Sequence, residues 1–107
     1  MKNAIHELSN SEKNTVKLAL QATSEGPFFE EWEFQTLMGV DRSTLQDILN
    51  DWPEQKVENN EFICAIMNSL ANLIGYPHGQ EAELAKIIPG GIDELERIAN
   101  KLIKYGF

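Results

Sequence analysis

The sequence predicts an all-α fold, a compact bundle of five to six helices in a single domain over residues 1–107. Apolar residues recur at the three- and four-residue spacing of amphipathic helices, and no run shows the alternation of a half-buried strand. Glycine and proline interrupt these segments as short breaks. With 42% hydrophobic and 24% charged residues, a chain of this length can bury a modest core without a disulfide or a metal.

The first helix is expected to begin after Ser9 and to end near residues 25–27. Ser9 and Glu12 have the spacing of a capping box, in which each side chain accepts a hydrogen bond from the backbone N–H of the other residue. Ile5 and Leu8 are expected to form a preceding turn that packs against this helix.

The next two helices are separated by a glycine. One is expected over about residues 29–38, ending at Gly39, a residue suited to the left-handed turn after a helix. The following helix is expected to start with Asp41 as its N-cap and to end before Pro53. Its apolar face comprises Leu45, Ile48, Leu49 and Trp52.

The helix expected at about residues 59–74 is the most apolar, which predicts a central position with neighbours on several sides. A loop at 75–79 and a short helix at about 80–88 follow. The last helix is expected over about 92–104, with acidic residues in its first turns and lysines in its last, an order that complements the helix dipole. The inward positions of this last helix are predicted to be Ile92, Leu95, Ile98, Ala99, Leu102 and Ile103.

The stretch MGVDRSTLQDILN, residues 38–50, raises the question of DNA binding. In a helix-turn-helix, two short helices pack across a tight turn, so apolar residues and one glycine occupy fixed places. Residues 31–50 resemble this motif, and residues 43–50 resemble recognition helices of bacterial repressors, although no particular family is indicated. The matching residues are Phe34, Met38, Gly39, Val40, Leu45 and Ile48. One position departs: Gln35 stands where the motif usually has a small residue.

This resemblance implies a helix-turn-helix DNA-binding regulator that reads DNA with helix 41–52. The residues that would read bases are Arg42, Ser43, Gln46 and Asn50. Such a protein would also need a basic clamp for the phosphate backbone and a dimeric arrangement. The clamp would come from Lys13 and Lys17, or from Lys101 and Lys104 with Arg97.

The charge distribution argues against nucleic acid as the partner. The net charge is −8, and residues 25–61 carry all of it, because ten acids there face only Arg42 and Lys56. The net charge is +1 in the residues before this segment and −1 in the residues after it, so the two flanks together are neutral. An acidic segment repels phosphates and attracts basic partners, unless it serves only as a solvated surface.

The favoured hypothesis is therefore a small, acidic, non-catalytic protein-interaction domain that binds a basic protein partner through residues 28–58. An adaptor, inhibitor or immunity-type role would fit. The expected contacts are Glu30, Glu31, Trp32, Glu33, Asp47, Asp51 and Glu54. Phe28, Phe29 and Trp32 are either core residues, which small helical domains favour, or an exposed aromatic patch ringed by carboxylates.

No motif indicates catalysis, a cofactor or a metal site. Cys64 lies in an apolar run, where a buried, unreactive thiol is expected, and neither His6 nor His78 has metal-ligand spacing to a second ligand. The first residues lack the apolar region of a signal peptide, and no apolar run is long enough to span a membrane, so a cytoplasmic setting is expected. The apolar end at residues 105–107 either supports a dimer or folds back on its own domain.

Overall fold

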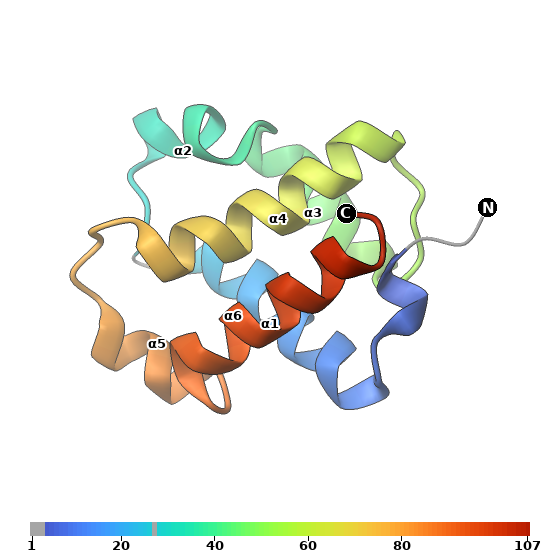
Figure 1. The fold of residues 1–107 in the computed structure, drawn as a ribbon. Coiled ribbons are helices and arrows are strands. Elements are labelled where there is room, and N and C mark those ends of the chain that lie inside the picture. The colour runs from blue at the N-terminus through green and yellow to red at the C-terminus, as the bar shows by residue number, and fades with distance from the viewer. Residues whose placement is uncertain (1–3, 27) are drawn as a thin grey trace.

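The computed structural model describes residues 4–26 and 28–107, which form one 3-10 helix and six α-helices (Figure 1). No strand occurs in these ranges, so the predicted all-α bundle is confirmed. The 3-10 helix, Ala4–Glu7, contains the buried Ile5 of the predicted turn. The α-helices are α1 (Asn10–Glu25), α2 (Glu31–Met38), α3 (Arg42–Asp51), α4 (Asn59–Gly75), α5 (Glu81–Ile87) and α6 (Gly91–Lys104).

Helix α4 occupies the centre of the bundle, as its apolar sequence predicts. It packs against α1, α2, α3 and α6. Figure 1 shows α4 crossing the middle of the molecule, with α6 running antiparallel beside it and α1 behind. Phe62, Ile66, Leu70 and Leu73 on α4 have no exposed surface. Within the described part of the chain, no helix is long and apolar enough to cross a bilayer.

Three helix ends have the caps that the sequence predicts. The Ser9 side chain accepts the Glu12 N–H while Glu12 accepts the Ser9 N–H at 2.7 Å, which completes the capping box. Asp41 accepts the Thr44 N–H at 2.8 Å, and this hydrogen bond lowers the pKa of Asp41. Gly39 has a φ of 75°, the left-handed conformation that allows α2 to end and the chain to turn.

Two asparagines on α4 hold the C-terminal end of α2. The Asn68 side chain donates to the Met38 carbonyl at 2.8 Å, and the Asn72 side chain donates to the Leu37 carbonyl at 3.0 Å. Carbonyls in the last turn of a helix lack intrahelical partners, so these bonds satisfy groups that would otherwise need water. The hydrophobic pattern of α4 gave no sign of this role.

The last residues of α3 are fixed to α1 through Trp52. Its indole N–H donates to the Lys13 carbonyl at 3.1 Å, and its ring stacks on Phe62 at a centroid distance of 6.3 Å. The peptide bond from Trp52 to Pro53 is cis. Trp52, which is partly buried, therefore joins α3, α1 and α4 at the edge of the core.

The apolar residues that match the helix-turn-helix motif belong to the hydrophobic core. The apolar positions of the motif are buried, namely Phe34, Met38, Val40, Leu45 and Ile48. The two helices nevertheless pack mainly on different partners, α2 on α4 and α3 on α1. Gln35 is exposed, so it does not press on a neighbouring helix at the position where the motif usually has a small residue.

The C-terminal end differs in part from the expectation. Ile103 is predicted to face inward, but its side chain is 57% exposed. The buried residues of α6 are Leu95, Ile98 and Leu102, and Ile103 lies beside this stripe. The Phe107 N–H donates to the Leu102 carbonyl at 2.9 Å, and the Phe107 ring meets Phe62 edge to face. Phe107 thus folds back on its own domain, whereas Tyr105 is 46% exposed.

Candidate functional site

The aromatic residues at the start of the acidic segment separate into core and surface. Phe28 and Phe29 are buried, with 2% and 8% of their surface exposed, whereas Trp32 is 78% exposed. The expectation that all three close over the core is correct for the phenylalanines and wrong for Trp32. The reason is position: the two phenylalanines precede α2, whereas the buried residues of α2 itself are Phe34 and Met38.

A histidine holds the two phenylalanines in place. The His78 ring contacts Phe28 edge to face at a centroid distance of 5.0 Å and Phe29 at 6.2 Å. His78 Nε2 lies 3.0 Å from the Leu73 carbonyl, and Nδ1 accepts the Gln80 N–H at 2.9 Å. This pattern places the proton on Nε2 and gives His78 a structural role.

Three of the predicted contact carboxylates already have partners within the chain. Glu33 accepts the hydroxyl hydrogen bond of Tyr76, which raises the pKa of Tyr76. Asp51 lies 3.7 Å from the ammonium of Lys56. Glu31 pairs with Arg42.

The other predicted carboxylates are free on the surface. Of the described residues, Glu30, Asp47 and Glu54 are exposed and form no ion pair. Asp47 shares the outer face of α3 with Ser43 and Asn50, which are also exposed. The helical spacing of these three residues therefore produces a polar face, and Glu54 follows in the turn after α3.

Arg42 and Gln46, two of the predicted base readers, instead bind the end of α1. The Arg42 guanidinium donates to the Ser24 carbonyl and, at 2.9 Å, to Glu31, and it lies 4.1 Å above the Phe34 ring. The Gln46 side chain donates to the Ser24 hydroxyl. Both side chains would have to leave these contacts before reaching a base edge. The structure thus separates them from Ser43 and Asn50.

Two of the cations predicted to clamp phosphates are bound to a buried carboxylate. Arg97 and Lys101 on α6 contact Glu12 on α1 at 2.8 and 2.9 Å, and the Glu12 side chain is only 8% exposed. Burial alone would raise the pKa of Glu12, but the hydrogen bonds from Ser9, Lys101 and Arg97 outweigh it and lower the pKa to about 2.

The cations that remain for a phosphate clamp lie on two helices. Lys13 and Lys17 are half-buried on α1, and Lys104 is exposed at the end of α6, 5.8 Å from the centre of the Tyr105 ring. In the described part of the chain, none of these three forms an ion pair.

In the described part of the chain, His6, Cys64 and His78 lie on different elements, namely the 3-10 helix, α4 and the loop after α4. Among the described residues, no group of three or more histidine, cysteine, aspartate or glutamate side chains is placed to hold a metal ion. Cys64 is half-buried, not fully buried as expected, and its side chain lies beside Gly39. His6 is exposed on the 3-10 helix.

A scan of the chain against models of protein families found no match. Searches of curated proteins and of solved structures also found no similar protein.

Proposed function

We propose that this protein is a non-catalytic interaction domain that binds a basic protein partner through the surface of α2 and α3. An adaptor, inhibitor or immunity-type role would use such a surface. The observation that supports the proposal most is the exposure of Trp32 on a helix whose first turn is acidic. Trp32 is the proposed anchor, with Glu30, Asp47 and Glu54 as the carboxylates that attract the partner.

An exposed tryptophan favours binding for a physical reason. A tryptophan side chain buries about 150–250 Å² when it is covered, and each Å² contributes about 25 cal/mol. Covering the 78% of Trp32 that is exposed would therefore contribute roughly 3–5 kcal/mol before the costs of association. Tryptophan is also enriched among the residues that dominate binding energy at protein interfaces.

The carboxylates supply attraction and orientation. No described residue forms an ion pair with Glu30, Asp47 or Glu54, so these carboxylates offer negative charge to a basic partner. Exposed charges act mainly on the association rate and on partner choice, and salt screens them. We therefore expect binding to weaken as the salt concentration rises.

The role of Trp32 can be tested with Trp32→Ser, using Tyr105→Ser as the matched control. Tyr105, near the C-terminal end, is also an exposed aromatic, 46% exposed, so its replacement removes an exposed aromatic ring of smaller area away from the proposed surface. The immobilised protein should capture a partner from lysate of the source organism, Trp32→Ser should lose it, and Tyr105→Ser should retain it. Equal capture by both variants would exclude Trp32 as the anchor.

The role of the carboxylates needs a charge-matched comparison. Glu30→Lys with Asp47→Lys reverses two charges on the proposed surface and leaves the Glu31–Arg42 pair intact. Glu81→Lys with Glu96→Lys makes the same net change at exposed positions on α5 and α6. Loss of capture in the first pair alone supports the proposed surface, whereas equal loss in both would mean that only net charge matters.

A further inference from the structure

The imidazole of His78 joins the end of α4 to the start of α5. The Leu73 carbonyl lies in the last turn of α4, and the residue that would supply its helical N–H is Pro77, which has none. His78 Nε2 lies 3.0 Å from this carbonyl and donates in its place. Nδ1 accepts the N–H of Gln80, the residue before α5, at 2.9 Å. The two hydrogen bonds coexist only in the neutral ring, because one nitrogen donates and the other accepts.

The same ring supports the chain that leads into α2. Phe28 and Phe29 are buried, and their ring centroids lie 5.0 and 6.2 Å from that of the imidazole. Phe29 also meets the Tyr76 ring edge to face at a centroid distance of 5.5 Å. These four residues, Phe28, Phe29, Tyr76 and His78, form one aromatic cluster.

The aromatic cluster is connected directly to the first turn of α2. The Tyr76 hydroxyl donates to the Glu33 carboxylate, and Glu33 follows Trp32 in that turn. Trp32 itself is exposed, so its place on the surface depends on how the start of α2 is held.

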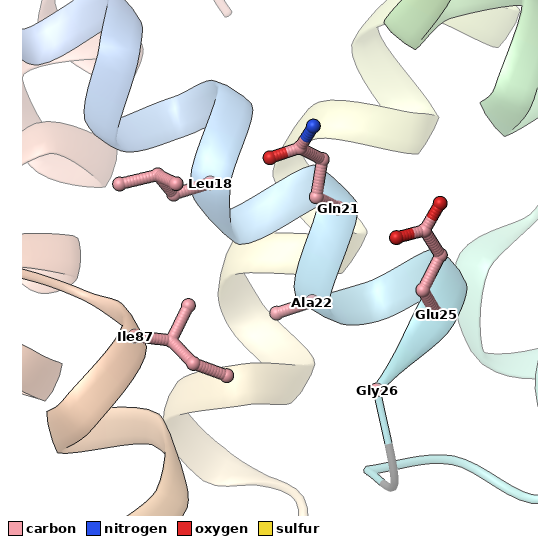
Figure 2. Close-up of a pocket in the computed structure, with 6 residues that line it drawn as sticks. All are labelled: Leu18, Gln21, Ala22, Glu25, Gly26 and Ile87. Atoms are coloured by element: carbon pink, nitrogen blue, oxygen red, sulfur yellow. The ribbon is translucent and has the colours of Figure 1, made fainter.

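The cluster also meets the end of α1. A Cβ at Gly26 would lie 2.8 Å from the Phe28 ring, so Phe28 is in close contact with the chain that leaves α1. Figure 2 shows Gly26 at this point, where it borders a shallow depression between α1 and α5 whose apolar lining includes Leu18, Ala22 and Ile87. A shift of the imidazole therefore changes the packing where α1, α4 and the start of α2 meet.

The elements around the cluster are rich in carboxylates. Those at the end of α1, at the start of α2 and on α5 are Glu25, Glu30, Glu31, Glu33, Glu81 and Glu83. The cations on the facing parts of α3 and α5 are Arg42 and Lys86, which pair with Glu31 and Glu83, and α4 carries no charge after its first turn. The Glu33 hydrogen bond raises the pKa of Tyr76, and the charges of Glu33 and Glu30 add to this effect, so their field reaches the cluster. An imidazolium would be drawn toward these carboxylates and away from the Gln80 N–H.

We propose that His78 makes the presentation of Trp32 depend on pH. Histidine is the side chain that commonly gains a proton between about pH 8 and 5. In the imidazolium both ring nitrogens carry hydrogen, so Nδ1–H would face the Gln80 N–H and this hydrogen bond is lost. The ring then leaves the place where Phe28 and Phe29 pack on it, and the start of α2 loosens. Acidification therefore weakens binding through Trp32. The inference rests on the proposed function in taking Trp32 as the anchor.

The test follows NMR signals of the whole chain from about pH 7.5 to 5.5, a range in which ordinary carboxylates stay ionised. The His78 ring signals should titrate, and a set of other signals should move with the same midpoint. That set comprises the backbone amides of Phe28, Phe29 and Gln80 and the indole N–H of Trp32. His6, exposed on the 3-10 helix, is the internal control, because it has no contact with the aromatic cluster.

His78→Asn and His6→Asn are the matched variants. The side-chain oxygen of an asparagine at position 78 can accept the Gln80 N–H but cannot gain a proton in this range, so the movements should disappear. In His6→Asn they should remain. Movements that persist in His78→Asn would overturn the proposal. If that variant does not fold, the wild type decides: a His78 ring that does not titrate, or one that titrates while the Phe28 and Phe29 amides stay still, overturns it equally.

Capture of the partner measures the consequence. The wild type should bind about three- to tenfold more weakly at pH 5.5 than at pH 7.5, the effect of one lost hydrogen bond, and His78→Asn should bind equally at both. Equal binding by the wild type at both pH values would overturn the proposal.

The outcome is separable from that of the proposed function, because the NMR titration needs no partner. If the cluster does not respond to pH while Trp32→Ser abolishes capture, the pH dependence is wrong and the interaction surface stands. If the cluster responds while Trp32→Ser and the charge reversals leave capture unchanged, the proposed surface is wrong although the cluster is pH-sensitive.

Discussion

The contact between Glu12 and α6 leads to the most quantitative prediction. Glu12→Gln preserves the shape of the side chain and removes its charge. The wild-type carboxylate accepts from Ser9 at 2.7 Å, from Lys101 at 2.9 Å and from Arg97 at 2.8 Å. The variant keeps one acceptor oxygen, but it loses the second one and the negative charge that makes the bonds to Lys101 and Arg97 ion pairs.

The size of the effect follows from the pKa of Glu12. Folding lowers this pKa from 4.5 to about 2. At about 1.4 kcal/mol for each pKa unit, the ionised carboxylate stabilises the fold by roughly 3 kcal/mol at most. The Arg97 side chain is 53% exposed, and solvent screens its share. We therefore expect Glu12→Gln to lower the free energy of unfolding by about 2 kcal/mol near neutral pH.

The same reasoning fixes the pH dependence. Since the folded pKa lies below the unfolded value, the stabilisation is fully present above about pH 4.5 and disappears as the pH falls toward 2. Urea unfolding of the wild type and of Glu12→Gln, at several pH values from about 7 to 3, measures the difference directly. The two proteins should converge as the pH falls.

Glu96→Gln is the control for this experiment. Glu96 is an exposed acid on α6, so its replacement should change the free energy of unfolding by no more than about 0.5 kcal/mol. A difference between wild type and Glu12→Gln below about 0.5 kcal/mol near neutral pH would refute the reasoning. A difference that stays constant down to about pH 3 would refute it equally.

Three further substitutions test the core contacts by urea unfolding. Gly39→Ala should cost about 1–2 kcal/mol, because its φ of 75° strains any L side chain; an unchanged unfolding midpoint would contradict the turn geometry. Asn72→Ala should cost about 1 kcal/mol and speed amide hydrogen exchange in α2, since it leaves the Leu37 carbonyl without its donor; exchange that speeds up equally in α6 would argue against this local role. Trp52→Phe should cost about 1–2 kcal/mol through the lost hydrogen bond to the Lys13 carbonyl, and wild-type stability would show that this bond contributes nothing.

The features that the sequence predicts correctly depend on neighbouring residues. The capping box at Ser9, the cap at Asp41 and the turn at Gly39 each follow from chemistry within a few residues, and all three are observed. The central place of α4 follows from an apolar content that only burial on several sides can satisfy.

The features that the sequence does not reveal depend on residues far apart in the chain. The hydrogen bonds from Arg42 to Ser24 and Glu31, and from Asn72 to the end of α2, form only when the helices have packed together. A polar residue on a helix gives no sign of whether it will face solvent or a distant carbonyl. Helical position alone therefore predicts Arg42 as a base reader, although the Ser24 carbonyl and Glu31 hold its guanidinium.

The exposure of Trp32 could not be predicted for a similar reason. Its neighbours Phe28 and Phe29 are aromatic as well, and no local pattern shows that they are buried before α2 while Trp32, in the first turn of α2, faces solvent. The lining of the depression between α1 and α5 brings Ile87 against a helix that ends more than sixty residues earlier. No local pattern connects these two segments.

The claim that this chain binds a basic protein is tested most directly by capture from lysate of the source organism. The capture is performed with and without nuclease and at low and moderate salt. The account predicts a basic protein that remains after nuclease treatment and is lost as salt rises, because exposed carboxylates attract it. Nucleic acid whose recovery nuclease abolishes would contradict the account and support DNA reading by α3 through Ser43 and Asn50.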